Sequence, residues 1–278
     1  MKRQFTIIII LAVASTAFLF ALPKVVVKDE AKVSSANRDA PAKSEVKSAQ
    51  NFTENHVIKL TAEQQKSVDD LKKTLTESKD KMLISKVLAK ISAVFSSANR
   101  LDSAASYAEK IALLEPNQAT FLQAGDAYTQ AANLSLQPAI GETLAAKARA
   151  NYQKVLDLNP HNLRAKTNMG MTYVSSQTPM QGILLLREVL DEDPNYEPAL
   201  MSLGMLSMQS SQFDKAVGRF RQVLKINPKN TIAQLYLGLS LAETKENTEA
   251  KKVLEDLISK DKDPAIQQEA KKALESLK

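Results

Sequence analysis

Residues 197–230 read EPALMSLGMLSMQSSQFDKAVGRFRQVLKINPKN, and the stretches on either side share their spacing of small residues and proline. Each stretch has a glycine and a second small residue twelve positions later, and a proline recurs near the end of the units, although the last one has Lys262 where the proline belongs. These positions recur every 34 residues, at Gly170, Gly204 and Gly238, at Gly182, Ala216 and Ala250, and at Pro160, Pro194 and Pro228. A fixed interval over consecutive units indicates a repeat architecture. The sequence predicts three units in one register, at 163–196, 197–230 and 231–264.

Each unit has the pattern of two antiparallel helices that cross closely. Small residues at the crossing allow the helix axes to approach each other. Larger apolar residues at fixed positions are expected to pack the pair, at Met169, Leu203, Leu237 and Tyr173 in the first helix and Leu186, Phe220 and Leu254 in the second. The proline cannot continue a helix, so it is expected to end the second one.

This pattern resembles the tetratricopeptide repeat family, whose unit carries a small residue early, another midway and a proline at its end. The resemblance implies an all-α solenoid, here of about five helix pairs plus flanking helices behind an N-terminal transmembrane helix. Weaker matches upstream extend the predicted repeats to residues 85–264. Residues 61–84 are predicted to form a leading helix that starts at a Thr61–Gln64 capping box, and 265–278 a polar helix that caps the last unit.

The second unit departs from the pattern. Gly125 and Ala148 are 23 positions apart, whereas Gly170 and Gly182 are 12 apart. The eleven additional residues, approximately 134–144, are expected either to lengthen both helices or to form a protruding turn.

The N-terminus begins with Lys2 and Arg3 and then runs without charge from Phe5 to Leu22, 18 residues. As a helix this run would be about 27 Å long, close to the hydrocarbon thickness of a bilayer. We therefore predict a membrane anchor at 1–23, with a cleaved signal as the alternative. Residues 24–60, rich in Lys, Ser and Ala, are predicted to be a flexible linker.

The location follows from the same segment. A hydrophobic segment at the start of a chain is the usual export signal, and large domains translocate largely regardless of flanking charges. We expect a single-pass protein of the inner membrane with its repeats in the periplasm, similar to bacterial membrane-anchored periplasmic tetratricopeptide proteins.

The composition argues against most catalytic chemistry. The chain has no Cys and no Trp, only seven Gly, and two His, at positions 56 and 161. Thiolate metal sites and glycine-rich phosphate loops are therefore excluded. We expect no enzyme activity, no cofactor, no metal and no small-molecule substrate. An atypical active site at Asp126, Glu142 or the acidic run 188–193 is the alternative, but no base, nucleophile and orienting group can be named together.

The net charge of +6 raises the question of nucleic-acid binding. Residues 1–60 hold nine Lys/Arg against five Asp/Glu, and residues 61–278 hold 28 against 26. The repeats are therefore nearly neutral and lack a basic face with interleaved aromatic residues, so we expect no nucleic-acid partner.

Three of the eight methionines lie within eight positions, at Met201, Met205 and Met208. On a helical wheel they fall together, away from the side of the helix that faces its pair. The resemblance implies that such first-helix positions line a concave groove, here at Met171, Met201, Met205, Met208, Leu235 and Leu239. The alternative is that these residues pack adjacent first helices together, since methionine fills irregular gaps. Arg164 and Asn168 occupy two places typical of clamps for C-terminal carboxylates, but the fourth and fifth units have no counterparts.

These observations favour a membrane-tethered scaffold or adaptor for protein–protein interaction, which binds a segment of an unidentified partner protein in the groove. The alternative is a structural homo-oligomerisation module of an envelope assembly, in which the stripe is buried between copies.

Overall fold

The computed structural model describes residues 59–277, which form helices joined by short turns, with no β-strand in this range. The predicted anchor at 1–23 and most of the predicted linker lie outside the described residues. The helices, in chain order, are α2 (Ala62–Glu77), α3 (Lys81–Ser97), α4 (Leu101–Leu114), α5 (Gln118–Asn133), α6 (Pro138–Leu158), α7 (Leu163–Val174), α8 (Pro179–Glu192), α9 (Glu197–Gln209), α10 (Phe213–Ile226), α11 (Thr231–Glu243), α12 (Asn247–Lys260) and α13 (Pro264–Ser276).

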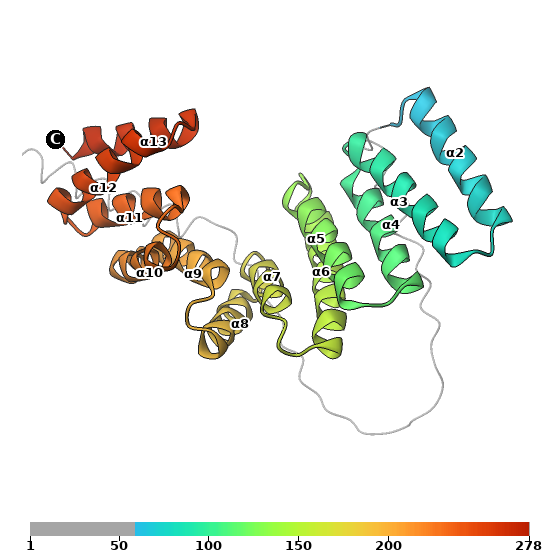
Figure 1. Ribbon diagram of the computed structural model, residues 1–278, viewed down its shortest axis with the longest axis horizontal. Helices are drawn as coiled ribbons and strands as arrows, with labels where there is room; N and C mark the ends of the chain where they lie inside the picture. The colour runs from blue at the N-terminus through green and yellow to red at the C-terminus, as the bar shows by residue number, and fades with distance from the viewer. Residues whose placement is uncertain (1–58, 278) are drawn as a thin grey trace, which may run out of the picture. The chain divides into compact units, whose positions relative to one another are not determined.

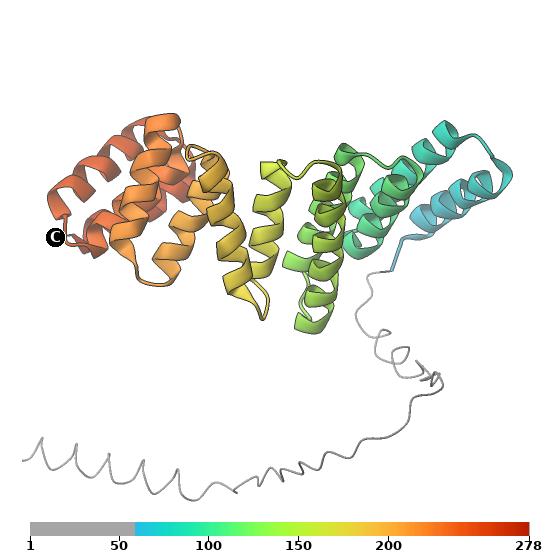
Figure 2. The same cartoon turned by 90° about the horizontal axis from the view of Figure 1, so that it is seen from below.

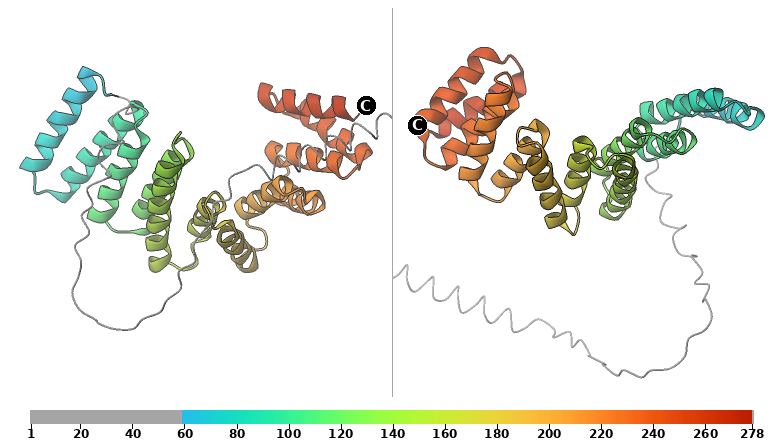
Figure 3. Two further views of the ribbon diagram at one scale, coloured as in Figure 1. Left: turned by 180° about the vertical axis from the view of Figure 1, so that it is seen from behind. Right: turned by 60° about the horizontal axis from the view of Figure 1, so that its bottom comes forward.

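The helices pack in sequence order as antiparallel pairs (Figures 1 and 2). Five pairs, α3–α4, α5–α6, α7–α8, α9–α10 and α11–α12, are flanked by α2 and α13. The first helices of successive pairs are also in contact: α5 with α7, α7 with α9, and α9 with α11. Figure 3 shows the same order from two further sides. The prediction of an all-α solenoid of helix pairs is therefore confirmed for the described residues.

Several helices begin at residues whose side chains cap the helix N-terminus. Thr61 and Gln64 form the predicted reciprocal capping box at the start of α2. At α7 and α11 an asparagine side chain accepts from the third residue's N–H, Asn162 from Ala165 and Asn230 from Ala233. Asp80 caps α3 through the Met82 N–H, so α3 begins at Lys81, before the expected start of the first unit at about 85.

The eleven additional residues of the second unit lengthen both of its helices. α5 has 16 residues and α6 has 21, whereas α9 and α10 have 13 and 14. Only Leu134–Gln137 separate α5 from α6, and Pro138 occupies the first position of α6, where its missing N–H costs nothing. Of the two expected outcomes, the structure therefore shows longer helices.

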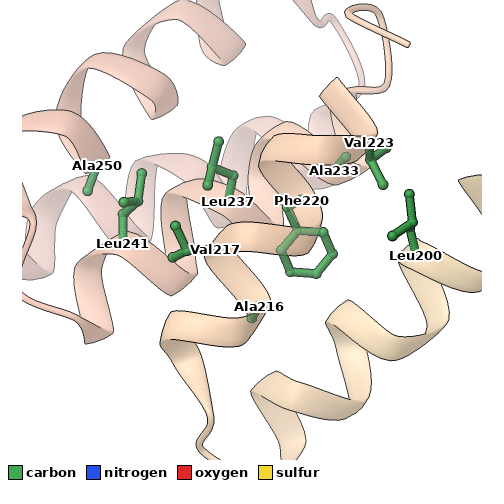
Figure 4. Packing of buried hydrophobic residues seen from close by; sticks show 9 residues of the cluster. All are labelled: Leu200, Ala216, Val217, Phe220, Val223, Ala233, Leu237, Leu241 and Ala250. Atoms are coloured by element: carbon green, nitrogen blue, oxygen red, sulfur yellow. The ribbon is translucent and has the colours of Figure 1, made fainter. Parts of the chain in front are cut away.

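The largest core cluster joins the fourth and fifth units (Figure 4). Phe220 of α10 is fully buried, with Leu200 of α9 on one side and Leu237 and Leu241 of α11 on the other. A Cβ atom on Gly204 would lie 2.6 Å from the Phe220 ring, closer than real contacts. The repeated glycine therefore makes room for the large side chain on the second helix.

Three turns between paired helices contain a non-glycine residue in the left-handed region, Asn99, Ser211 and Lys245. At the end of α9, the Gln212 N–H donates to Ser207 O at 2.7 Å and the Ser211 N–H to Met208 O at 2.9 Å. This is a Schellman ending, which usually places glycine where Ser211 stands.

Replacement of Ser211 by glycine is therefore expected to stabilise the fold. The φ angle of Ser211 is 56°, which glycine adopts without steric cost. We expect Ser211→Gly to raise the free energy of unfolding by about 0.5–1 kcal/mol, measured by urea denaturation. The matched change Ser210→Gly, at a residue with φ of −95°, should give no gain. A loss of stability in Ser211→Gly would contradict this account of the turn.

No helix among residues 59–277 combines the length and apolar character that crossing a membrane requires.

Candidate functional site

The three clustered methionines lie on α9, the first helix of the fourth unit. Met201, Met205 and Met208 are each partly buried and pack against the cluster that contains Ala233, Leu237 and Leu241 of α11. The same cluster contains residues of α9 and α10, so the three side chains pack at the junction of the fourth and fifth units. Each of them keeps part of its surface accessible to solvent.

The other predicted groove residues differ in accessibility. Met171 of α7 is partly buried against Leu186, Val189, Ala199 and Leu203. Leu239 of α11 is also partly buried, whereas Leu235 is only 7% exposed.

Helix α12 and the C-terminal helix α13 together bury Leu235. Leu235 belongs to a cluster with Leu254, Leu257, Ala270 and Ala273, the last two from α13. This helix thus covers the end of the stripe. Met171, Met201, Met205, Met208 and Leu239 remain as the accessible set, and we call these five residues the methionine stripe.

A polar cluster lies on the same register at α5. Asp126 follows Gly125 as Met171, Met205 and Leu239 follow their glycines. Its carboxylate accepts from Arg164 Nη2 at 2.6 Å, Asn168 Nδ2 at 2.8 Å and the Tyr152 hydroxyl at 2.9 Å. Arg164 remains 61% exposed. Along the row of first helices, the charged pair Asp126–Arg164 thus lies at α5 and α7, and the apolar methionine stripe starts at Met171 of α7 and continues on α9 and α11.

The sequence alone does not assemble this polar cluster. It indicates Arg164 and Asn168 as possible clamp residues and Asp126 as a carboxylate of an atypical active site, but separately. In the structure both clamp side chains are engaged by Asp126. One feature of the sequence could have indicated the cluster, namely the repeat register, which places Asp126 one residue after the repeated glycine.

Two tyrosines of the second unit are buried beside carboxylates. Burial raises the pKa of Tyr152 above its ordinary value of 10.0, and Asp126 adds to the effect, while the hydrogen bond with Thr129 partly offsets it. Burial likewise raises the pKa of Tyr128, and the Glu109 carboxylate, 2.8 Å from its hydroxyl, adds to this.

The raised pKa values predict a loss of stability at alkaline pH. The folded-state pKa lies above the unfolded one, so this contribution is complete below pH 10 and declines as the pH rises beyond it. We expect a phenolate absorbance titration to show these tyrosines ionising only with unfolding. As the pH rises beyond 10, the double variant Tyr128→Phe/Tyr152→Phe should lose less of its neutral-pH free energy of unfolding than the parent does. An equal loss in both chains would contradict the assignment.

Two of the other acidic residues considered for catalysis, Glu142 and Glu192, have structural partners. Glu142 pairs with Arg149 at 2.6 Å. Glu192, in the acidic run, pairs with His161 at 2.8 Å and Lys166 at 3.0 Å. Hydrogen bonds from Lys166 and then His161 lower the pKa of Glu192. Within residues 59–277, no three His, Asp or Glu side chains lie close enough together to hold a metal ion.

The C-terminal part of the chain matches a known family. Residues 207–274 match the tetratricopeptide repeat family. A search of curated proteins finds no match to this sequence.

Solved structures of tetratricopeptide proteins share the fold. A tetratricopeptide repeat protein from Parabacteroides merdae is 14% identical, with a TM-score of 0.54, over 77% of this chain and 85% of that one. A thermophilic tetratricopeptide protein from Thermus thermophilus is also 14% identical, with a TM-score of 0.51, over 68% of this chain and 98% of that one. At this identity the likeness concerns the fold alone. Tetratricopeptide proteins are generally non-enzymatic scaffolds for protein–protein interaction.

Proposed function

We propose that this protein is an adaptor that holds a segment of a partner protein along its first helices. The methionine stripe binds the apolar side of the segment, and the polar cluster at Asp126, Arg164 and Asn168 contacts its polar side. An amphipathic helix or an extended segment with alternating apolar residues has this chemistry. Methionine side chains suit such a role because they are flexible and polarizable.

The observation that carries the proposal is the partial exposure of Met201, Met205 and Met208 on one helix. A stripe that only packed adjacent helices would be buried, as Leu235 is at 7% exposure. Clustered apolar side chains left partly in water favour a further contact.

The proposal is tested by site-specific photo-crosslinking in the native cell. A photoreactive amino acid replaces Met208 in the full chain, and a matched chain carries it at Leu184, which is 51% exposed on the second helix α8. We expect Met208 to capture a defined partner segment that Leu184 does not. Crosslinks only to further copies of this chain would instead favour the homo-oligomerisation module. Identical products from both positions would refute the groove.

We further propose that residues 1–23 anchor the chain in the inner membrane and that the repeats lie in the periplasm. The proposal is supported by the uncharged run from Phe5 to Leu22 after Lys2 and Arg3. Because the chain has no Cys, a single Met180→Cys change gives one labelling site, at a side chain that is 58% exposed. A maleimide that cannot cross the inner membrane should label it in intact cells whose outer membrane has been made permeable. Labelling only after lysis would place the repeats in the cytoplasm.

A further inference from the structure

A cleft of about 410 Å³ lies on the second helices, between α4 and the N-terminal half of α6. Its apolar walls come from Phe95, Tyr107, Ile140 and Leu144, and its polar lining from Asp102, Ser103, Ser106, Thr143 and Lys147. Three of the lining residues, Ile140, Thr143 and Leu144, belong to the stretch inserted in the second unit. The cleft is therefore a product of the insertion, and it is separate from the methionine stripe, which lies on first helices.

Apolar side chains at this end of the second unit are exposed. Ile140 is 39% exposed in the first turn of α6, and Leu134 and Leu136 in the preceding turn are 63% and 98% exposed. Neighbouring large apolar side chains in water indicate a contact surface rather than a solvated one.

The first described residues pack against a cluster that shares two aromatic residues with this cleft. Leu60 packs against a cluster that contains Phe95 and has Tyr107 at its edge. Phe95 and Tyr107, whose rings stack with centroids 5.5 Å apart, also line the cleft. Leu60, the second of the described residues, is thus linked to the cleft through this cluster, and a seven-residue segment reaches at most about 25 Å when extended.

The seven residues at 52–58, FTENHVI, have the composition to occupy it. They include Phe52, Val57 and Ile58, whereas residues 28–51 contain no apolar residue larger than valine. Glu54 carries the opposite charge to Lys147 of the cleft, and His56, when protonated, carries the opposite charge to Asp102. We propose that residues 52–58 dock in the cleft between α4 and α6, where they cover Ile140 and fix the point at which the linker joins the repeats. This contact is independent of the proposed partner groove.

Photo-crosslinking within the full chain tests the docking. A photoreactive amino acid replaces Ile140, and a matched chain carries it at Leu184. Labelled and unlabelled chains are mixed, so that mass spectrometry separates crosslinks within one chain from those between copies. We expect crosslinks from position 140 to residues 52–58 of the same chain, and none to that segment from position 184. Crosslinks from position 140 only to another copy, only to residues 24–51, or to nothing would overturn the proposal.

Hydrogen exchange provides a second test that leaves the cleft residues unchanged. Two aspartates in the segment, Val57→Asp/Ile58→Asp, should abolish docking in the full chain. The amides of residues 140–147 should then exchange faster, by about tenfold. The matched variant Val25→Asp/Val26→Asp, at the start of the linker, should leave these rates at the parent value. Equal rates in both variants would overturn the proposal.

Discussion

Replacement of Gly182 by alanine is expected to destabilise the repeats by about 2–3 kcal/mol. A Cβ atom at Gly182 would meet the carbonyl oxygen of Gly170 and would lie 2.8 Å from both the backbone nitrogen and a methyl carbon of Val174. Two of these neighbours are backbone atoms of α7, so α7 and α8 would have to separate. The loss should exceed the gain of up to about 1 kcal/mol that alanine brings to a helix interior. Urea denaturation followed by circular dichroism measures it.

The matched control is Gly218→Ala. Gly218 lies inside α10 and has no atom within 4 Å of the position its Cβ would take. Alanine there should stabilise the helix by about 0.5–1 kcal/mol. A Gly182→Ala variant as stable as Gly218→Ala would show that the α7–α8 crossing is looser than described.

The variant Met205→Glu is expected to weaken partner binding at least tenfold, equivalent to about 1.4 kcal/mol. Met205 lies in the middle of the methionine stripe, between Met201 and Met208 in the sequence of α9. A carboxylate there would have to lose its water when the apolar side of the partner segment covers it, which is costly without a paired cation. The affinity for the segment captured from position 208 measures the effect.

Two further variants separate binding from folding. Met180→Glu makes the same change at a methionine 58% exposed on α8 and should leave affinity unchanged. Met205→Leu keeps the site apolar and should bind within a few-fold of the parent. Both the helicity and the urea midpoint of Met205→Glu are measured alongside. A folded Met205→Glu chain with parental affinity would contradict the role of the stripe.

Most of the fold could be predicted from the sequence because the repeat fixes a register. The prolines at 160, 194 and 228 each lie two residues beyond the end of a second helix, at Leu158, Glu192 and Ile226. The register also located the insertion between Gly125 and Ala148. The sequence could not choose between longer helices and a protruding turn, since that depends on whether Pro138 begins a helix or ends one.

The candidate site was less predictable because it depends on contacts between units. The register placed Met205 and Leu235 on one stripe, but the packing of α12 and α13 buries Leu235. Likewise Asp126 lies on α5 whereas Arg164 and Asn168 lie on α7, and their hydrogen bonds follow from the packing of α5 on α7. The left-handed conformation of Ser211 could not be predicted either, because the sequence has no glycine at this position.

The central claim is that a partner segment binds along the methionine stripe, and methyl NMR tests it most directly. The chain contains eight methionines, so isotope labelling of their methyl groups places probes on and off the stripe at once. When the captured segment is added, the signals of Met171, Met201, Met205 and Met208 should shift, while those of Met82 and Met180, 64% and 58% exposed outside the stripe, should not. Shifts confined to Met82 or Met180, or no shift at saturating segment, would contradict the account.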